Sequence, residues 1–219
     1  MKNRKTELIQ IVFFFICLMF VSELKAQDVE NNYKTRTSVE LSFKPIKNFK
    51  LNFIPELRFD ENFSLDKYLF DAEVVYKPIK FLSFDASYRL GGNIRDNKDT
   101  EYFNRFAISA TASKKFDRFE PSFRLRYSND ADDDLVNENF LRYKLLLNYD
   151  IQNSKLTPFV GVEAFHELAD AEIYKMRYIA GLDYKLFKNN YLGLNYKFDY
   201  FLKEYKNNHI VSLGYKIKF

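Results

Sequence analysis

The chain has 219 residues, 34 Lys and Arg against 30 Asp and Glu, and a formal net charge of +4 at pH 7. This length fits one domain better than two. The basic residues are interleaved with acidic ones, which argues against a nucleic-acid-binding protein with its clustered basic patch. With 24 Phe and 16 Tyr but only 6 Gly and 5 Pro, the composition favours β-strands.

The N-terminus has the pattern of an export signal. Basic residues at positions 2, 4 and 5 precede an apolar run over residues 11–21, which is too short for a transmembrane helix and suits a signal-peptide core. We expect cleavage after Ala26, so that 1–26 is the signal peptide and 27–219 the mature barrel; a retained N-terminal anchor is the alternative. Cys17, the only cysteine, lies inside the apolar run, so we expect neither a lipid anchor nor a disulfide.

The rest of the chain alternates apolar and polar residues with a period of two. In residues 191–200, Leu194 and Tyr196 share one face while Asn195 and Lys197 share the other. Successive strand side chains point to opposite sides, so each such segment has one apolar and one polar face. In chain order the segments cover 33–43, 49–59, 67–77, 82–90, 102–113, 119–128, 139–150, 157–167, 175–185, 191–200 and 207–219. Most match the roughly 9 to 11 residues with which a tilted strand crosses a bilayer.

The connections alternate between short turns and longer polar loops, as in outer-membrane barrels. The short turns are 44–48, 78–80, 115–118, 151–156 and 187–190, and the longer loops are 60–66, 92–101, 129–138, 168–173 and 202–206. The pattern contains eleven strands, whereas bacterial barrels have even numbers. We therefore predict an all-β fold, an antiparallel transmembrane β-barrel of about 12 strands, with about 10 as the next choice.

Charge on the polar faces predicts a charged lumen, because the apolar faces must meet hydrocarbon, which cannot hold charge. The charges expected to point inward are Arg58, Asp71, Glu73, Arg89, Arg124, Arg126, Arg142, Glu163, Arg177, Asp183, Lys197 and Asp199. They either pair across the lumen and mostly close it, or form the wet face of each strand. Arg124 and Arg126, with Arg142 and Lys144 on the next strand, form a basic stripe that could bind anions unless inward acids neutralise it.

The C-terminal segment resembles the strand that the barrel-assembly machinery recognises. Tyr215, Ile217 and Phe219 share one face of an alternating, aromatic-rich strand that ends in Phe. We therefore expect this machinery, outer-membrane lipid and lipopolysaccharide as partners. The sequence leaves the oligomeric state open.

Candidates for chemistry are few. His166 and His209 fall near the outer rim, where a barrel hydrolase would act. Alternation places both with the lipid-facing residues, and no serine shows a nucleophile motif. Asp130, Asp132 and Asp134 look like part of a calcium loop that lacks the turn glycine and the terminal Glu. We therefore expect no catalytic residue, metal or cofactor, and keep the two histidines and three aspartates as alternatives.

Short motifs spread over nearly all of the mature chain resemble the uncharacterised family called domain of unknown function 2490. They are Pro55-Glu-Leu-Arg-Phe-Asp-Glu-Asn, Leu65-Asp-Lys-Tyr, Val75-Tyr-Lys-Pro, Ser87-Tyr-Arg89, Asn104-Arg-Phe106, Arg124-Leu-Arg-Tyr127, Leu141-Arg-Tyr-Lys144, Pro158-Phe-Val-Gly161, Arg177-Tyr and Gly181-Leu-Asp-Tyr184. The resemblance implies a secreted outer-membrane barrel of unknown role and supplies no catalytic residues.

Three functions are compatible with the sequence. The leading one is a non-enzymatic barrel in the outer membrane of a Gram-negative bacterium, with a structural, adhesive or narrow transport role. The alternative is an outer-membrane barrel hydrolase acting on lipid or lipopolysaccharide. The third is a soluble secreted lipocalin-like binder, whose strands would place the apolar residues inside.

Overall fold

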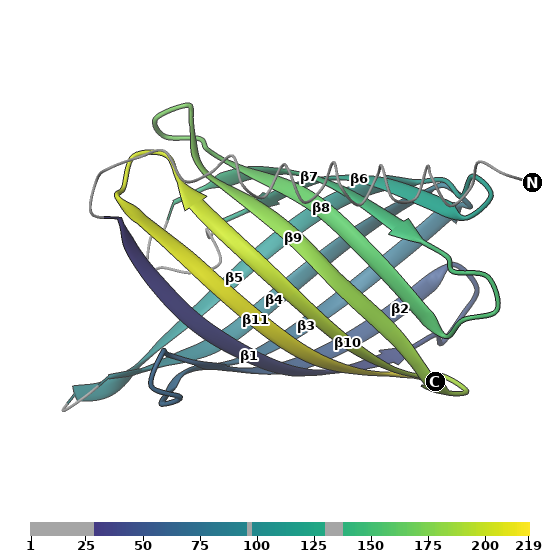
Figure 1. Ribbon diagram of the computed structural model, residues 1–219, viewed down its shortest axis with the longest axis horizontal. Helices are drawn as coiled ribbons and strands as arrows, with labels where there is room; N and C mark the ends of the chain where they lie inside the picture. Colours follow the sequence, from purple (N-terminus) through teal and green to yellow (C-terminus); the bar gives the residue numbers. More distant parts are fainter. Residues whose placement is uncertain (1–28, 96–97, 130–137) are drawn as a thin grey trace, which may run out of the picture.

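The computed structural model describes residues 29–95, 98–129 and 138–219. Their regular secondary structure is all β, wound into one barrel (Figure 1). The eleven strands of this part of the chain are β1 (Glu30–Phe43), β2 (Phe49–Phe59), β3 (Leu65–Ile79), β4 (Leu82–Arg95), β5 (Lys98–Ser113), β6 (Phe119–Ser128), β7 (Phe140–Tyr149), β8 (Leu156–Glu167), β9 (Glu172–Phe187), β10 (Asn190–Phe201) and β11 (Lys206–Lys218). Each predicted segment corresponds to one strand. The predicted signal peptide, 1–26, lies outside the described residues.

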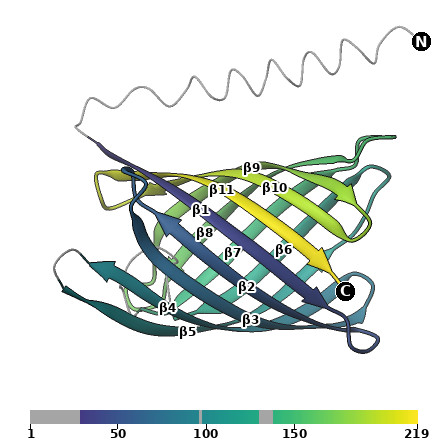
Figure 2. The same ribbon diagram turned by 90° about the horizontal axis from the view of Figure 1, so that it is seen from below.

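A parallel pairing of β1 with β11 closes the barrel, while every other neighbouring pair is antiparallel. The two strands lie side by side in Figure 2. The predicted number of 12 strands is therefore wrong, as is 10: the described residues form eleven. The even-number rule assumes that the first and last strands run in opposite directions. A parallel ladder also satisfies the backbone groups of both strands, so the barrel closes without a twelfth strand.

Because the number of strands is odd, β1 begins at one end of the barrel and the last strand finishes at the other end. β1 begins at the end of the barrel that carries the connections 60–64, 168–171 and 202–205, which we call the loop end. The C-terminus lies at the opposite end, which carries the connections 44–48, 80–81, 114–118, 150–155 and 188–189 and which we call the turn end (Figure 1). Asn48, Asp117, Asn153 and Asn189 take positive φ angles of 70°, 52°, 59° and 65° in four of these turns. Asn and Asp tolerate this conformation better than other side chains do.

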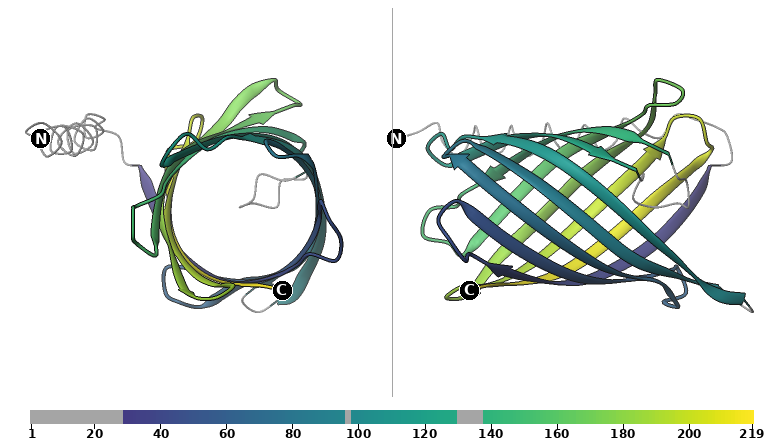
Figure 3. Two further views of the ribbon diagram at one scale, coloured as in Figure 1. Left: turned by 90° about the vertical axis from the view of Figure 1, so that its right-hand side faces the viewer. Right: turned by 180° about the vertical axis from the view of Figure 1, so that it is seen from behind.

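The predicted loop over 92–101 is mostly strand. β4 continues to Arg95 and β5 begins at Lys98, so this hairpin reaches beyond its neighbours (Figure 3). Its polar residues pair across the two strands: Asn93 faces Glu101 in the register, and Arg95 forms an ion pair with Glu101. Polar composition predicted a loop here, but cross-strand charge pairs stabilise the extended backbone instead.

The barrel has an inverted polarity. Large apolar side chains on the outside are exposed, such as Leu194 at 50% and Phe106 at 48%, while the inward Arg177 and Asp199 are 2% and 0% exposed. Because strand side chains alternate, each strand contributes to both faces of the wall that Figure 3 shows end-on. None of the described residues form a helix that is long and apolar enough to cross a membrane.

The parallel seam can be tested by cross-linking. Thr37 and Leu213 face each other across β1 and β11, and neighbouring strands lie about 5 Å apart, which a disulfide can span. In a Cys17→Ser background, T37C/L213C should therefore form a disulfide on oxidation, seen as a mobility change on non-reducing gels. T37C/I217C is the control, because four residues along the strand add about 13 Å. Cross-linking of the control pair alone would contradict this register.

Candidate functional site

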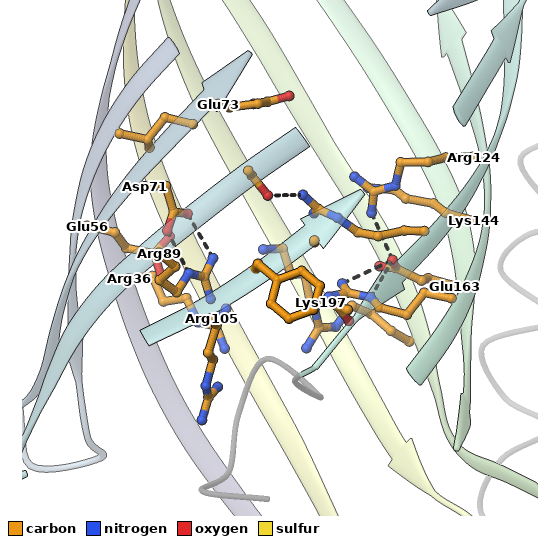
Figure 4. A pocket seen from close by; sticks show the side chains of 18 of the residues that line it. Arg36, Glu56, Asp71, Glu73, Arg89, Arg105, Arg124, Lys144, Glu163 and Lys197 are labelled. Carbon is orange, nitrogen blue, oxygen red and sulfur yellow. Dashed lines mark hydrogen bonds and ion pairs between the residues drawn. The ribbon is translucent and has the colours of Figure 1, made fainter. Parts of the chain in front are cut away.

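The inward faces of the strands enclose a charged cavity of about 240 Å³. Figure 4 shows its side chains converging from opposite walls of the barrel. The described residues that line it include ten basic ones, Arg36, Arg58, Arg89, Arg105, Arg124, Arg126, Arg142, Lys144, Arg177 and Lys197, and four acidic ones, Glu56, Asp71, Glu73 and Glu163. Alternation alone puts them there, since each lies an even number of residues from the other inward positions of its strand.

On the wall built by β2 to β4, acids and bases are paired. Arg89 donates two hydrogen bonds to Asp71, with Nε–Oδ1 at 2.7 Å and Nη2–Oδ2 at 2.9 Å. Arg58 Nε lies 2.6 Å from an oxygen of Glu56. The fork-shaped, charge-assisted contact of Arg89 with Asp71 holds its guanidinium plane in a fixed orientation. This wall therefore carries little unbalanced charge.

On the opposite wall, basic side chains share Glu163 of β8 as their hydrogen-bond acceptor. Its side chain is 2% exposed and accepts hydrogen bonds from Arg124 Nη2 at 2.8 Å and from Arg142 Nε at 3.1 Å. The strand register sets it beside Lys144 on one side and Arg177 on the other. One carboxylate thus faces four cations, and its charge is essential to the packing of this wall.

Aromatic rings fill the lumen at the loop end between β7 and β10. Phe140 and Phe165 are fully buried, and Phe201 is 2% exposed. Three cations lie over the ring of Phe165, with Arg142, Lys175 and Arg177 at 4.3, 4.6 and 5.0 Å from its centroid. Cations are attracted to ring faces, so the aromatic cluster stabilises buried positive charge. Sequence reasoning missed this cluster, although each of these Phe residues interrupts a polar face.

The structure brings ten of the twelve charges predicted for the lumen together around the cavity: Arg58, Asp71, Glu73, Arg89, Arg124, Arg126, Arg142, Glu163, Arg177 and Lys197. Asp199 lies beside the cavity, buried, where it accepts from Arg177 at 2.6 Å and from Lys175 at 3.2 Å. Asp183 is nearer the turn end, opposite Gly193 and Thr157.

The two histidines lie apart on the outer surface. Tyr196 and Asn31 hydrogen-bond His209, with Nδ1 2.6 Å from the Tyr196 hydroxyl and Nε2 3.2 Å from Asn31 Oδ1. His209 also stacks on Tyr33, with ring centroids 4.9 Å apart. His166 lies on β8, with β9 and β10 between it and His209, and its ring stacks near Tyr143. Among the described residues, no hydrogen bond or ring contact joins the two histidines to each other or to a serine.

The calcium-loop candidates Asp130, Asp132 and Asp134 lie outside the described residues. Within the described ranges no group of three or more His, Cys, Asp or Glu is arranged to hold a metal ion. At the C-terminus, Tyr215 and Ile217 pair with Val39 and Leu41 across the seam. Phe219 stacks on Phe43 at 4.6 Å, which ties the end of the chain to β1 at the turn end.

Exposed ion pairs also lie at both ends of the barrel. At the loop end, the hydrogen bond from Lys203 to Glu172 raises the pKa of the Lys203 ammonium. At the turn end, a hydrogen bond to Asp150 raises the pKa of Lys115 in the same way. Both lysines are exposed in connections, so their pairs contribute little to stability.

The fold and the cavity define a closed all-β barrel with a strongly charged interior. The family described as protein of unknown function (DUF2490) matches residues 34–209, and the chain belongs to it. This confirms the resemblance found in the sequence motifs. A search of curated proteins finds no match to the chain.

Replacement of Glu163 by Gln should destabilise the barrel. The change leaves Arg124, Arg142 and their neighbours without the carboxylate that they share, and breaking a buried ion pair from one side costs about 3–5 kcal/mol. Urea unfolding would measure the loss of stability, with the exposed Glu120→Gln as control. The double variant E163Q/R142Q should be less destabilised than E163Q, because one of the stranded cations is removed as well. Equal stability of E163Q and wild type would refute the role given to Glu163.

Proposed function

We propose that this protein is a non-enzymatic β-barrel of the Gram-negative outer membrane, and that its charged lumen admits small polar solutes. The inverted polarity of the wall supports the proposal. Exposed Phe, Leu, Tyr and Val side chains cover the outside, whereas Arg177, Lys175, Glu163 and Asp199 are buried inside. A water-soluble barrel would have to do the opposite to gain from burying apolar surface.

Strand length and closure fit the same environment. The strands have 10 to 16 residues, enough to cross the hydrocarbon core with about 9 to 11. Their closed ladder satisfies the backbone N–H and C=O groups, which lipid cannot do. A charge facing the lipid would cost roughly 2–4 kcal/mol at the midplane, and the lumen removes that cost.

The lumen favours passage or binding of solutes over the other roles considered. A scaffold or an adhesin makes no use of an internal cavity, whereas at least fourteen charged residues among the described ones line this cavity. A hydrolase would need a base beside a nucleophile at a rim. The two histidines instead face outward and contact aromatic and amide side chains.

The partners follow from the location. Outer-membrane lipid and lipopolysaccharide contact the apolar exterior, and the barrel-assembly machinery recognises β11 through Tyr215, Ile217 and Phe219. Phe219 is 64% exposed, so its ring is accessible at the strand end.

Cell fractionation tests the location. The expressed protein should be recovered with the outer membrane, and it should migrate faster on a detergent gel before boiling than after it, because a closed barrel resists unfolding by detergent. Salt washing should leave it in the membrane. Recovery in the soluble fraction without a mobility shift would contradict the proposal and would favour a secreted β-domain with an internal pocket.

Phe219→Ala tests recognition by the assembly machinery. This variant should reduce the amount of heat-shifting protein in the outer membrane, while protein refolded in detergent still shows the shift. Phe187→Ala is a matched control, because Phe187 is also an exposed ring at the turn end, 60% accessible. If the two variants reach the outer membrane equally well, the terminal Phe is not part of the signal.

A further inference from the structure

Four cations on β6 and β7 face one another inside the barrel and form what we call the basic block. The register sets Arg124 opposite Lys144 and Arg126 opposite Arg142. All four line the cavity, and Figure 4 shows Arg124 and Lys144 side by side on one wall. Like charges directly opposite each other destabilise a strand pair, so this arrangement opposes folding unless negative charge lies close by.

The protein supplies part of that negative charge. Glu163 accepts from Arg124 and Arg142, and a carboxylate oxygen of Asp85 lies 3.7 Å from Arg126. Two carboxylates thus contact a block of four cations, which leaves an excess of two positive charges. The cavity as a whole shows the same sign, with ten basic against four acidic residues among the described lining.

Hydrogen-bond donors of the block are also incompletely used. The Nε atoms of Arg124 and Arg126 are buried and have no hydrogen-bond partner among the described residues. Arg126 does use Nη2, which donates to Ser87 at 2.9 Å and so holds the guanidinium toward the opposite wall. Buried donors without acceptors are costly, and an acceptor with several oxygens would satisfy both charge and donors.

We propose that the basic block binds a phosphate group, and that the cavity accommodates a small phosphorylated solute or free phosphate. A phosphate ester carries about −1.5 to −2 charges at neutral pH, which matches the excess of two positive charges, and its oxygens fit the forked donors of arginine. The cavity of about 240 Å³ is smaller than the usual ligand pocket of roughly 300–1,000 Å³, so the solute is small. This deepens the proposed function, on which it rests for the entry of solutes into the lumen.

Calorimetry on the detergent-folded full chain tests the site with inorganic phosphate as the probe. Wild type should bind phosphate saturably, more tightly than acetate at the same ionic strength, and more weakly as NaCl rises. Arg126→Gln and Arg142→Gln should each weaken binding about tenfold or more, the loss expected for one charged hydrogen-bonding group. Arg118→Gln is the matched control: this arginine lies in a connection at the turn end, hydrogen-bonded to Gln152, and its loss should leave binding unchanged.

Folding of each variant is checked by the heat-dependent gel shift. Loss of Arg126 relieves repulsion in the block, and Asp85 keeps its hydrogen bond from Ser109 although it loses the 3.7 Å contact with Arg126, so Arg126→Gln should still form the heat-shifting barrel. Absence of saturable phosphate binding, or equal binding by Arg126→Gln, Arg142→Gln and wild type, would overturn the phosphate site. Glucose 6-phosphate binding as tightly as phosphate identifies an ester as an accepted solute, whereas its exclusion would overturn the phosphorylated-solute part and leave free phosphate. The binding assay is done in detergent and does not depend on where the protein lies in the cell. Recovery of the protein in the soluble fraction would therefore contradict the proposed function without changing the binding result.

Discussion

The hydrogen-bonded ladder closes through the parallel pairing of β1 with β11, and the other features of the barrel depend on that closure. An open sheet would leave the outer edges of these two strands with unpaired N–H and C=O groups, which could pair with another chain. Closure also divides each strand into an inner and an outer face, so that a period of two in the sequence becomes a separation of charge from apolar surface. The same pairing sets the start of β1 and the C-terminus at opposite ends.

Closure concentrates charge in a narrow lumen. The two walls of the lumen differ in how their charges are compensated. Around β2 to β4, Asp71 and Glu56 pair with arginines one for one. Around β6 to β9, Glu163 forms ion pairs with Arg124 and Arg142, and the ring of Phe165 stabilises further positive charge through cation–π contacts. Buried charge that is only partly compensated lowers stability. The wall around β6 to β9 therefore lowers the stability of the barrel, as ligand-binding sites commonly do.

Much of this fold can be predicted from the sequence, because one strong signal, the period of two, fixes both the strands and their faces. It identifies the eleven segments and the inward side of Arg124 and Glu163. The closing pair is not predictable in this way, since local alternation says nothing about which strands meet. Nor is the register that sets Arg126 opposite Arg142. The cluster of Phe140 and Phe165 is not predictable either, because a single apolar residue on a polar face gives no sign of which other residues it packs against.

In the proposed function, the outer face of the wall meets lipid and the inner face lines a polar lumen. Fluorescent labels on single cysteines along β10, in protein folded into vesicles of brominated lipid, test it directly. Labels at Leu194 and Tyr196 should be quenched strongly by the bromines, and labels at Asn195 and Lys197 weakly, in strict alternation. Quenching without a period of two, or stronger quenching at the inward positions, would contradict this orientation of the strands.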